Sequence, residues 1–218
     1  MIKELELYSL ASPNGQKISI ALEEMGLAYK ATTINIMKGE QFTPEFIKIN
    51  PNSKIPALID PDGPGGKPIS IMESGAILIY LAQKSGKFFP QDPRLQSEVL
   101  QWLFFQVGGV GPMFGQFGHF FKYAVEKCDH PYPVERYSTE VKRLLGVLDR
   151  HLEGKYFLVG EQYTIADMAT VPWINGVDVF YNAGEKLELS KFKNVMAWVR
   201  RVLDRPKTAV GMNVCKFN

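Results

Sequence analysis

Residues 52–81 read NSKIPALIDPDGPGGKPISIMESGAILIYL, and this stretch decides the fold. It contains a β-rich run, a turn built from proline, aspartate and glycine, and a second short strand at 69–72. The short turn makes the two strands an antiparallel pair. Helical spacing of the apolar residues begins at Glu73, so we expect the second strand to run directly into a helix. Glu73 and Ser74 open that helix, where free N–H groups and the positive end of the helix dipole favour a bound carboxylate.

The residues before this stretch predict two further strands and two helices. Residues 5–8 and 29–35 have strand patterns, and a helix runs between them from Gln16 to a stop at Gly26. A short helix begins at Pro44 and is capped by Thr43. A crossover helix makes the first two strands parallel. The complete order, β-α-β-α-β-β-α, is that of the thioredoxin fold.

A proline stands before the third strand, where that fold places one opposite a reactive sulfur. We expect the Ile55–Pro56 bond to be cis, since X–Pro bonds alone adopt cis at modest cost. Such a turn exposes the N–H and C=O groups of Ile55, which could pair with an extended peptide.

The remainder of the chain is helical in pattern. Residues 87–93 form a linker, so we expect a thioredoxin-like domain at 1–86 and an all-helical domain at 94–218. A helix from Leu95 runs into a glycine cluster, GGVGP at 108–112, which should kink it or let another backbone approach. Thr164 and Asp167 have the spacing of a capping box, and the last clear helix ends near Pro206.

Composition excludes several functional classes. The chain has 218 residues, of which 45% are hydrophobic, and a formal net charge of +2, which gives no reason to expect nucleic acid or a membrane surface as partner. No apolar run reaches membrane-spanning length and the first residues are charged, so we expect a cytoplasmic protein. Cys128 and Cys215 lie far apart, and no histidine spacing suits a metal.

Several short motifs carry a family resemblance. They are SPNG at 12–15, GEQFTPEF at 39–46, NPNSKIPA at 50–57, ESGAILIYL at 73–81, QWLFFQVGGVGPMFGQ at 101–116, ERY at 135–137 and TIAD at 164–167. The chain resembles the cytosolic glutathione transferases over essentially its whole length. More narrowly, it is similar to the bacterial nu class, a disulfide-bond reductase type, and to the related fungal nitrogen-regulator-like transferases.

The resemblance implies a homodimer that binds glutathione as co-substrate along the thioredoxin-like domain, with no metal. The γ-glutamyl end of glutathione would reach Glu73 and Ser74, and its cysteine backbone would pair with Ile55. Other contacts implied by the family are Gln41 and Lys54 at the glycyl end, and Arg136.

Ser12 and Asn14 are the catalytic candidates that the resemblance implies, as donors to the glutathione sulfur. Hydrogen-bond donors at a helix N-terminus lower a thiol pKa because they favour the thiolate. The bacterial pattern has threonine in place of Ser12, so the hydroxyl is kept. Two alternatives stay open: Ser12 and Asn14 simply cap the first helix, or Tyr8 is the thiolate donor.

The glycine-rich helix suggests a second site. Residues flanking the cluster would line the side that faces the sulfur, as a substrate or second-glutathione site; these are Gln106, Met113, Phe114, Gln116 and His119. A tight helix crossing is the structural alternative, and His119 alone is more often structural. The cluster is no dinucleotide motif, because helical patterns flank it on both sides.

The expected activity is glutathione-dependent reduction of small disulfides, with weaker conjugation and peroxide reduction. Glutathione thiols would do the redox work, because the protein supplies no cysteine of its own at the site. One alternative is a transferase that conjugates apolar electrophiles. The other is a non-catalytic glutathione-binding or regulatory module, which a fold alone never excludes.

Overall fold

The structure is a computed structural model that describes residues 4–217. It divides into two compact units. The first is made of the chain up to Phe89 together with the segment from Arg205 onward, and the second is Pro90–Asp204. The closing segment from Arg205 is thus grouped with the first unit. The domain bounds expected from the sequence, 1–86 and 94–218 with a linker at 87–93, stay a prediction.

A four-stranded mixed sheet forms the centre of the first unit. Its order is β2-β1-β3-β4, and its strands are β1 (Leu5–Ser9), β2 (Tyr29–Thr33), β3 (Ala57–Asp60) and β4 (Ile69–Ile71). Strands β1 and β2 are parallel, with Leu7 opposite Ala31, whereas β1 with β3 and β3 with β4 are antiparallel. The predicted strand directions are therefore confirmed.

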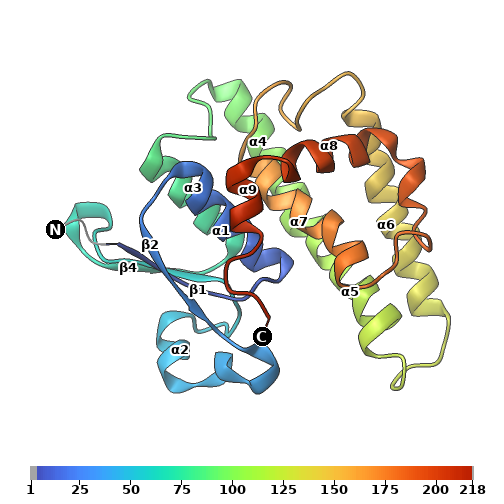
Figure 1. Ribbon diagram of the computed structural model, residues 1–218, viewed down its shortest axis with the longest axis horizontal. Coiled ribbons are helices and arrows are strands. Elements are labelled where there is room, and N and C mark those ends of the chain that lie inside the picture. The colour runs from blue at the N-terminus through green and yellow to red at the C-terminus, as the bar shows by residue number, and fades with distance from the viewer. Residues whose placement is uncertain (1–3, 218) are drawn as a thin grey trace. The chain divides into compact units, whose positions relative to one another are not determined.

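Helices cover both faces of this sheet (Figure 1). Helices α1 (Pro13–Met25) and α3 (Ser74–Ser85) pack together on one face, and α2 (Pro44–Ile49) lies on the other. Phe46 of α2 packs with Ala57 and Ile34, and Tyr8 joins this cluster from the second face of β1. The alternation along β1, with Leu5 and Leu7 buried, separates the two layers.

Helix α1 begins three residues earlier than the sequence predicted, at Pro13 instead of Gln16. Proline has no N–H to lose at a first helical position, and its fixed φ suits the helix. Ser12 is therefore the N-cap residue, and Asn14 lies inside the first turn. Both catalytic candidates are thus held at the positive end of the α1 dipole.

A short helix that the sequence analysis missed, α9 (Pro206–Gly211), packs against α1 within the first unit. Ser19 Oγ donates a 2.7 Å hydrogen bond to the Gly211 carbonyl, and the Ala11 N–H donates one of 2.7 Å to the Cys215 carbonyl. The segment from Arg205 therefore braces both α1 and the loop that leads into it.

The second unit is helical. Its helices are α4 (Pro93–Phe105), α5 (Gly111–Gly118), α6 (Tyr132–His151), α7 (Ile165–Val179) and α8 (Lys193–Leu203). A π-helical turn at Gln106–Val110 joins α4 to α5, and another, His119–Tyr123, follows α5. The glycine cluster thus becomes a π turn within a continuing helix. Gly118 lies so close to the Tyr181 ring that an added Cβ would overlap it.

The predicted capping box at the start of α7 is confirmed. The fully buried Asp167 carboxylate accepts hydrogen bonds from Thr164 N–H, Leu158 N–H and the Trp198 indole N–H at 2.8 to 3.0 Å. Burial raises the pKa of Asp167 to about 6, against the opposing effect of these hydrogen bonds. One side chain therefore holds the α7 start, a loop and α8 together.

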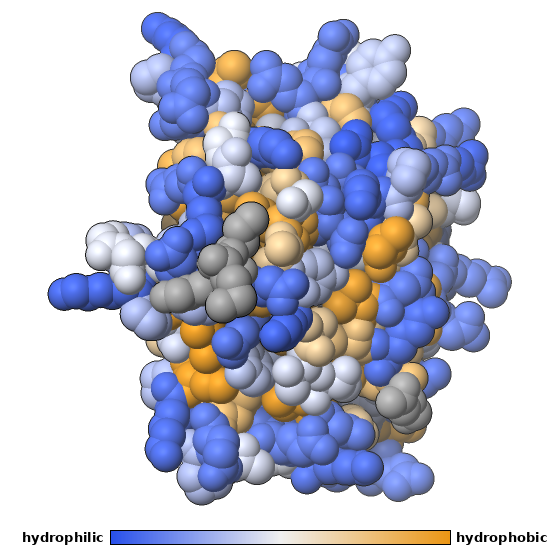
Figure 2. All heavy atoms as spheres, turned by 60° about the vertical axis from the view of Figure 1, so that its left-hand side comes forward, coloured by the Kyte–Doolittle hydropathy of each residue, from blue (hydrophilic) through white to orange (hydrophobic). Residues whose placement is uncertain are grey.

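On the face shown in Figure 2, hydrophilic side chains surround several separate apolar patches. Large apolar residues with at least 40% exposure in the first unit include Met37, Phe42 and Met72. Within residues 4–217, no helix is both long enough and apolar enough to span a membrane.

Candidate functional site

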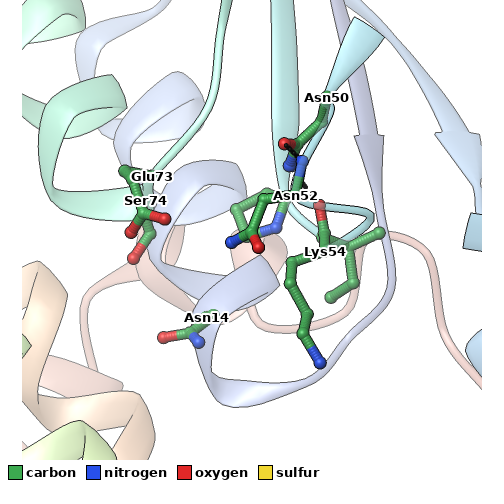
Figure 3. Close-up of a pocket in the computed structure, with 8 residues that line it drawn as sticks. Asn14, Asn50, Asn52, Lys54, Glu73 and Ser74 are labelled. Atoms are coloured by element: carbon green, nitrogen blue, oxygen red, sulfur yellow. Dashed lines mark hydrogen bonds between the residues drawn. The ribbon is translucent and has the colours of Figure 1, made fainter. Parts of the chain in front are cut away.

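A pocket of about 160 Å³ opens in the first unit, at the end of the sheet where α1 and α3 begin. Eight residues line it: Asn14, Asn50, Asn52, Lys54, Ile55, Pro56, Glu73 and Ser74. In Figure 3, Glu73 and Ser74 lie on one side and Lys54 on the opposite side, with Asn52 between them. Five of the residues predicted to bind or activate glutathione are thus brought together: Asn14, Lys54, Ile55, Glu73 and Ser74.

The Glu73–Ser74 wall is formed by an unusual backbone at the α3 start. Glu73 is the N-cap residue with φ 68° and ψ 113°, a conformation that non-glycine residues rarely adopt. Its side chain makes no capping hydrogen bond and is exposed. Strained residues of this kind cluster at ligand sites, where the surrounding structure holds them in place. The carboxylate is therefore available to a ligand ammonium, beside helix N–H groups that suit a ligand carboxylate.

A buried lysine lies behind this wall, and sequence reasoning missed it. Lys17 is 2% exposed, and its Nζ lies 3.2 Å from Ser74 Oγ. Burial lowers the pKa of Lys17 to about 7, although the Glu73 carboxylate opposes the shift. Lys17 stands three residues after Asn14 on α1, which is the spacing of neighbours on one helix face. This spacing from Asn14 was the signal in the sequence that could have identified Lys17.

Asn50 shapes the opposite wall. Its Oδ1 accepts a 2.9 Å hydrogen bond from Asn52 N–H, and its Nδ2 donates one of 2.7 Å to the Lys54 carbonyl. Asn50 is 2% exposed, so these bonds fix the loop rather than the ligand. Asparagine often forms such turns with the residue two positions on. The motif NPNS contained that signal, which the sequence analysis did not use.

Ile55 and Pro56 end this loop at the pocket. The Ile55–Pro56 bond is cis, as the sequence predicted. No hydrogen bond joins the Ile55 N–H or C=O to another residue between 4 and 217. The main chain here therefore offers one donor and one acceptor to an extended ligand.

Ser12 stands immediately before α1 and does not line the pocket itself. Its carbonyl accepts from Gln16 N–H at 2.9 Å, but its side chain makes no capping hydrogen bond. Ser12 therefore occupies the N-cap position without using its hydroxyl there. The hydroxyl and the Asn14 amide remain the candidates for donation to a sulfur at the helix start.

Tyr8, the rival donor, has its hydroxyl engaged elsewhere. It donates a 2.9 Å hydrogen bond to Glu6 Oε2. Burial and this carboxylate raise the pKa of Tyr8. Its one O–H cannot serve both Glu6 and a thiolate, which argues against the Tyr8 alternative.

The protein supplies no thiol to the pocket. Cys128 and Cys215 are both free, and neither lines it. Burial raises the pKa of Cys215, with a hydrogen bond to Thr33 acting against it, so this thiol is a poor nucleophile. In the described part of the chain, no three His, Cys, Asp or Glu side chains are grouped to hold a metal ion.

Two predicted glutathione contacts lie outside the pocket. Gln41, in the short 3₁₀ helix Glu40–Phe42, has a buried Oε1 with no hydrogen-bond partner among residues 4–217. Arg136 lies on α6 of the second unit, exposed, with its Nη1 3.8 Å from Glu140 Oε2. Their contacts with glutathione remain predictions.

The five residues predicted for a second site differ in exposure. Gln106 and Phe114 are fully buried, Met113 is half-buried, and Gln116 and His119 are exposed. Packing in the second unit accounts for Gln106 and Phe114, because the π turn that contains Gln106 and helix α5 that contains Phe114 both contact α6 and α7. Met113, Gln116 and His119 have the accessible surface that a lining residue needs.

Fold and pocket together define a thioredoxin-like α/β unit, with a polar pocket at the starts of α1 and α3, and a second unit that is helical. Residues 11–84 match the glutathione S-transferase N-terminal domain, and residues 110–206 match the C-terminal domain of the same family. The chain belongs to the glutathione S-transferase family.

Individual relatives show where the chain lies within this family. The chain is 44% identical over 209 residues to disulfide-bond oxidoreductase YfcG of Escherichia coli strain K12, covering 95% of this chain and 94% of that one. It is 35% identical to the transcriptional regulator URE2 of Saccharomyces cerevisiae, covering 93% and 66%. The bacterial and fungal resemblance seen in the sequence is therefore confirmed.

Solved structures of glutathione transferases are also similar to this chain. A glutathione transferase family member from Pseudomonas fluorescens, with two glutathione molecules bound, has a TM-score of 0.96 and 48% identity, covering 98% of this chain and 94% of that one. A glutathione transferase from Pseudomonas putida, with one glutathione disulfide bound per subunit, has a TM-score of 0.94 and 48% identity, covering 96% and 91%.

Proposed function

We propose that this protein is a glutathione-dependent disulfide-bond reductase. The observation that carries the proposal is the pocket, which joins Glu73 and Ser74 at the α3 start to Asn14 at the α1 start, with no cysteine among its lining residues. A protein that reduces disulfides from this pocket must take its sulfur from the ligand. The relatives that bind two glutathione molecules or glutathione disulfide support the same chemistry.

Each pocket wall has a role in this proposal. Glu73 binds the ammonium of the γ-glutamyl group, and Ser74 with the α3 N–H groups binds its carboxylate. Ile55 pairs with the cysteine backbone of glutathione, and Lys54 and Gln41 hold its glycyl carboxylate, with Arg136 as a further contact. This orientation brings the sulfur to the start of α1. There the Ser12 hydroxyl, the Asn14 amide and the helix dipole stabilise the thiolate.

The reaction then follows thiol–disulfide exchange. The glutathione thiolate attacks one sulfur of the substrate disulfide, forming a mixed disulfide and releasing the other sulfur as a thiolate that takes a proton. A second glutathione thiolate attacks the glutathione sulfur of the mixed disulfide. Two glutathiones are oxidised to glutathione disulfide, and the substrate disulfide is reduced to two thiols. Met113, Gln116 and His119 are the proposed lining for the second molecule.

The test is glutathione-driven reduction of hydroxyethyl disulfide by the variant Ser12→Ala with Asn14→Ala. We expect kcat/KM to fall by roughly 10²-fold, because donors to a developing anion contribute on this order. Tyr8→Phe is the matched control and should keep the wild-type rate, since the Tyr8 hydroxyl serves Glu6. An unchanged rate in the double variant would show that the assigned roles are wrong.

The same assay separates the alternatives. Faster turnover of an aryl halide than of the disulfide would favour a conjugating transferase. Absence of binding of glutathione and glutathione disulfide in calorimetric titration would favour a regulatory module. Reduction of the disulfide with bound glutathione supports the reductase.

We further propose a cytoplasmic homodimer. The family resemblance supports this proposal, and the exposed apolar side chains Phe42 and Met72 on one unit and Phe104 on the other are the candidates for the dimer contact. Two unpaired cysteines suit a reducing compartment. Sedimentation equilibrium should give the mass of two chains, and the mass of one chain would exclude the dimer.

A further inference from the structure

The second unit contains a pocket of its own, of about 330 Å³, between the loop that follows α6 and one face of α8. Helices α6 and α8 contact each other within this unit (Figure 1). The α8 residues Asn194, Ala197 and Arg201 are three and four positions apart, so they share a helix face. The other lining residues belong to the loop: Leu152, Gly154, Lys155 and Tyr156. The proposed reaction does not use this pocket.

The charge of this pocket is positive. Of the residues between 4 and 217, Lys155 and Arg201 line it, whereas no carboxylate does. Neither of these two side chains forms an ion pair with an aspartate or glutamate in the same part of the chain. Helix α8 carries three basic residues, Lys193, Arg200 and Arg201, and no acidic residue. A concave site lined by charge of one sign attracts ligands of the other sign, which here is an anion.

Lys155 is held by a neutral ring rather than by a carboxylate. His151 Nε2 lies 2.7 Å from the Leu158 carbonyl oxygen, which can only accept, so Nε2 carries the ring proton. Nδ1 of the same ring then accepts from Lys155 Nζ at 3.1 Å. The ammonium is thus positioned without being neutralised, and it keeps further N–H groups for a ligand.

Arg201 is held by the loop in a similar way. Its Nη1 donates a 2.7 Å hydrogen bond to the Tyr156 carbonyl, and its Cζ lies 5.0 Å from the centre of the Tyr156 ring. These contacts orient the guanidinium and use a neutral acceptor and a π face. The remaining N–H groups form a planar fork, which matches the oxygens of a phosphate group.

The acidic residues closest in sequence do not line the pocket. Asp149 Oδ1 accepts from Asn194 N–H at 2.9 Å and from Val195 N–H at 3.1 Å, so this carboxylate satisfies the start of α8. Its carbonyl accepts from Asn194 Nδ2 at 3.0 Å, which fixes the Asn194 side chain. Glu153, within the loop, is exposed. The two cations therefore keep their charge for a ligand.

We propose that this pocket binds the phosphate group of a small ligand, with Lys155 and Arg201 as its donors. A phosphate group carries enough negative charge to engage both cations, and charge-assisted hydrogen bonds of this kind are the strong ones. The volume falls within the range of small-molecule sites. Leu152 and Ala197 add apolar surface, which suits an organic group esterified to the phosphate. The site lies within the second unit and does not depend on the proposed glutathione pocket.

A structural role for the same residues gives a different expectation. If Arg201 only ties the loop to α8, and Lys155 only packs on His151, their removal lowers stability. The wild-type protein would then show no specific response to phosphate. Binding by the wild-type protein is thus a readout that a structural role does not move.

Backbone amide NMR spectra of the full chain measure this binding. Inorganic phosphate and phenyl phosphate are titrated separately at pH 7, at an ionic strength held constant with sodium chloride. We expect saturable shifts of the amides in 152–156 and 194–201 with both probes. Tighter binding of phenyl phosphate would identify a phosphate ester as the ligand, and equal affinities would identify free phosphate. Absence of saturable shifts in these two segments, or equal shifts with sodium chloride alone, would overturn the proposal.

Variants locate the phosphate group. Lys155→Met and Arg201→Gln should each weaken binding of phenyl phosphate by about tenfold or more, because each removes a hydrogen bond to a charged group. Lys193→Met is the matched control, since it removes a charge from α8 at a position that does not line the pocket, and its affinity should stay within about twofold of wild type. Unchanged affinity in both Lys155→Met and Arg201→Gln would overturn the proposal. If either variant does not fold, the wild-type titration decides by itself.

Discussion

At the scale of single residues, the pocket combines two features that are unfavourable for folding. Glu73 has a positive φ, and Lys17 is buried with a lowered pKa. Both lie on the side of the pocket formed by the α3 start. Residues that destabilise the fold are retained where function needs them, which supports a binding role for this wall.

Substitutions at Glu73 test the free-energy cost of its positive φ. Glycine adopts positive φ without strain, so Glu73→Gly should be more stable than Glu73→Ala by about 1 kcal/mol, the reverse of the usual order. Both variants lose the carboxylate and should lose glutathione affinity equally. Urea unfolding and calorimetric titration measure the two effects. A Glu73→Ala variant that is the more stable of the two would contradict this explanation.

The pH dependence of the free energy of unfolding tests the cost of burying the Lys17 charge. Its pKa is about 7 in the folded protein and 10.5 in a model lysine, so between these values the unfolded chain binds more protons. The stability of wild type relative to Lys17→Met should therefore rise with pH, by roughly 2 to 3 kcal/mol between pH 7 and pH 9. Urea unfolding at both pH values measures it. A difference that does not change with pH would mean that Lys17 does not titrate in this range.

At the scale of elements, the helix starts of the two units differ in how their free N–H groups are satisfied. In the first unit the starts of α1 and α3 lie at the pocket, and the N-cap side chain of neither helix makes a capping hydrogen bond. In the second unit the starts of α4 and α7 are closed by Asp92 and Asp167. The uncapped starts in the first unit suit the proposed glutathione site, whereas the capped starts in the second unit stabilise its packing.

The two capping aspartates should differ in their contribution to stability. Asp92 accepts from Arg94 N–H and Leu95 N–H at an exposed helix start, so Asp92→Ala should cost about 1 kcal/mol. Asp167→Ala leaves several buried donors unpaired, including the Trp198 indole, and should cost about 3 kcal/mol or more. Denaturant unfolding of the two variants compares them directly, and equal losses would show that burial adds nothing at Asp167.

At the scale of the whole molecule, the chain returns to its first unit at the end. Arg205 and Glu24 form a two-pronged ion pair at 2.7 and 2.8 Å, and Glu24 also accepts from Thr208. Burial alone would raise the pKa of Glu24, but these partners outweigh it and hold the pKa below its ordinary value. The closing segment is thereby fixed to α1, the helix that carries Asn14.

Breaking this pair should weaken the first unit. Arg205→Met leaves the Glu24 carboxylate, whose side chain is 5% exposed, without its cation and should cost about 2 to 4 kcal/mol at pH 7. Because the folded pKa of Glu24 is depressed, the loss should shrink as pH falls below about 4.5. Lys207→Met, which removes an exposed pair, should change stability by less than about 0.5 kcal/mol. Unfolding curves that show the same loss at pH 4 and pH 7 would contradict the assignment.

The sequence determined the order of elements, the strand directions, the α7 capping box and the family. These features are local, because alternation, helical spacing, caps and turns involve neighbours in the chain. It also identified five of the eight pocket residues by resemblance, since they stand within short motifs at 12–15, 50–57 and 73–81.

Only the tertiary structure decided which groups meet from distant parts of the chain. It brought Lys17 behind Ser74, and it packed the segment from Arg205 onto α1. The closing contacts of this segment, such as Ser19 with Gly211, join residues more than 190 positions apart. Burial and pairing at such distances arise from packing of whole elements, which local sequence patterns do not encode.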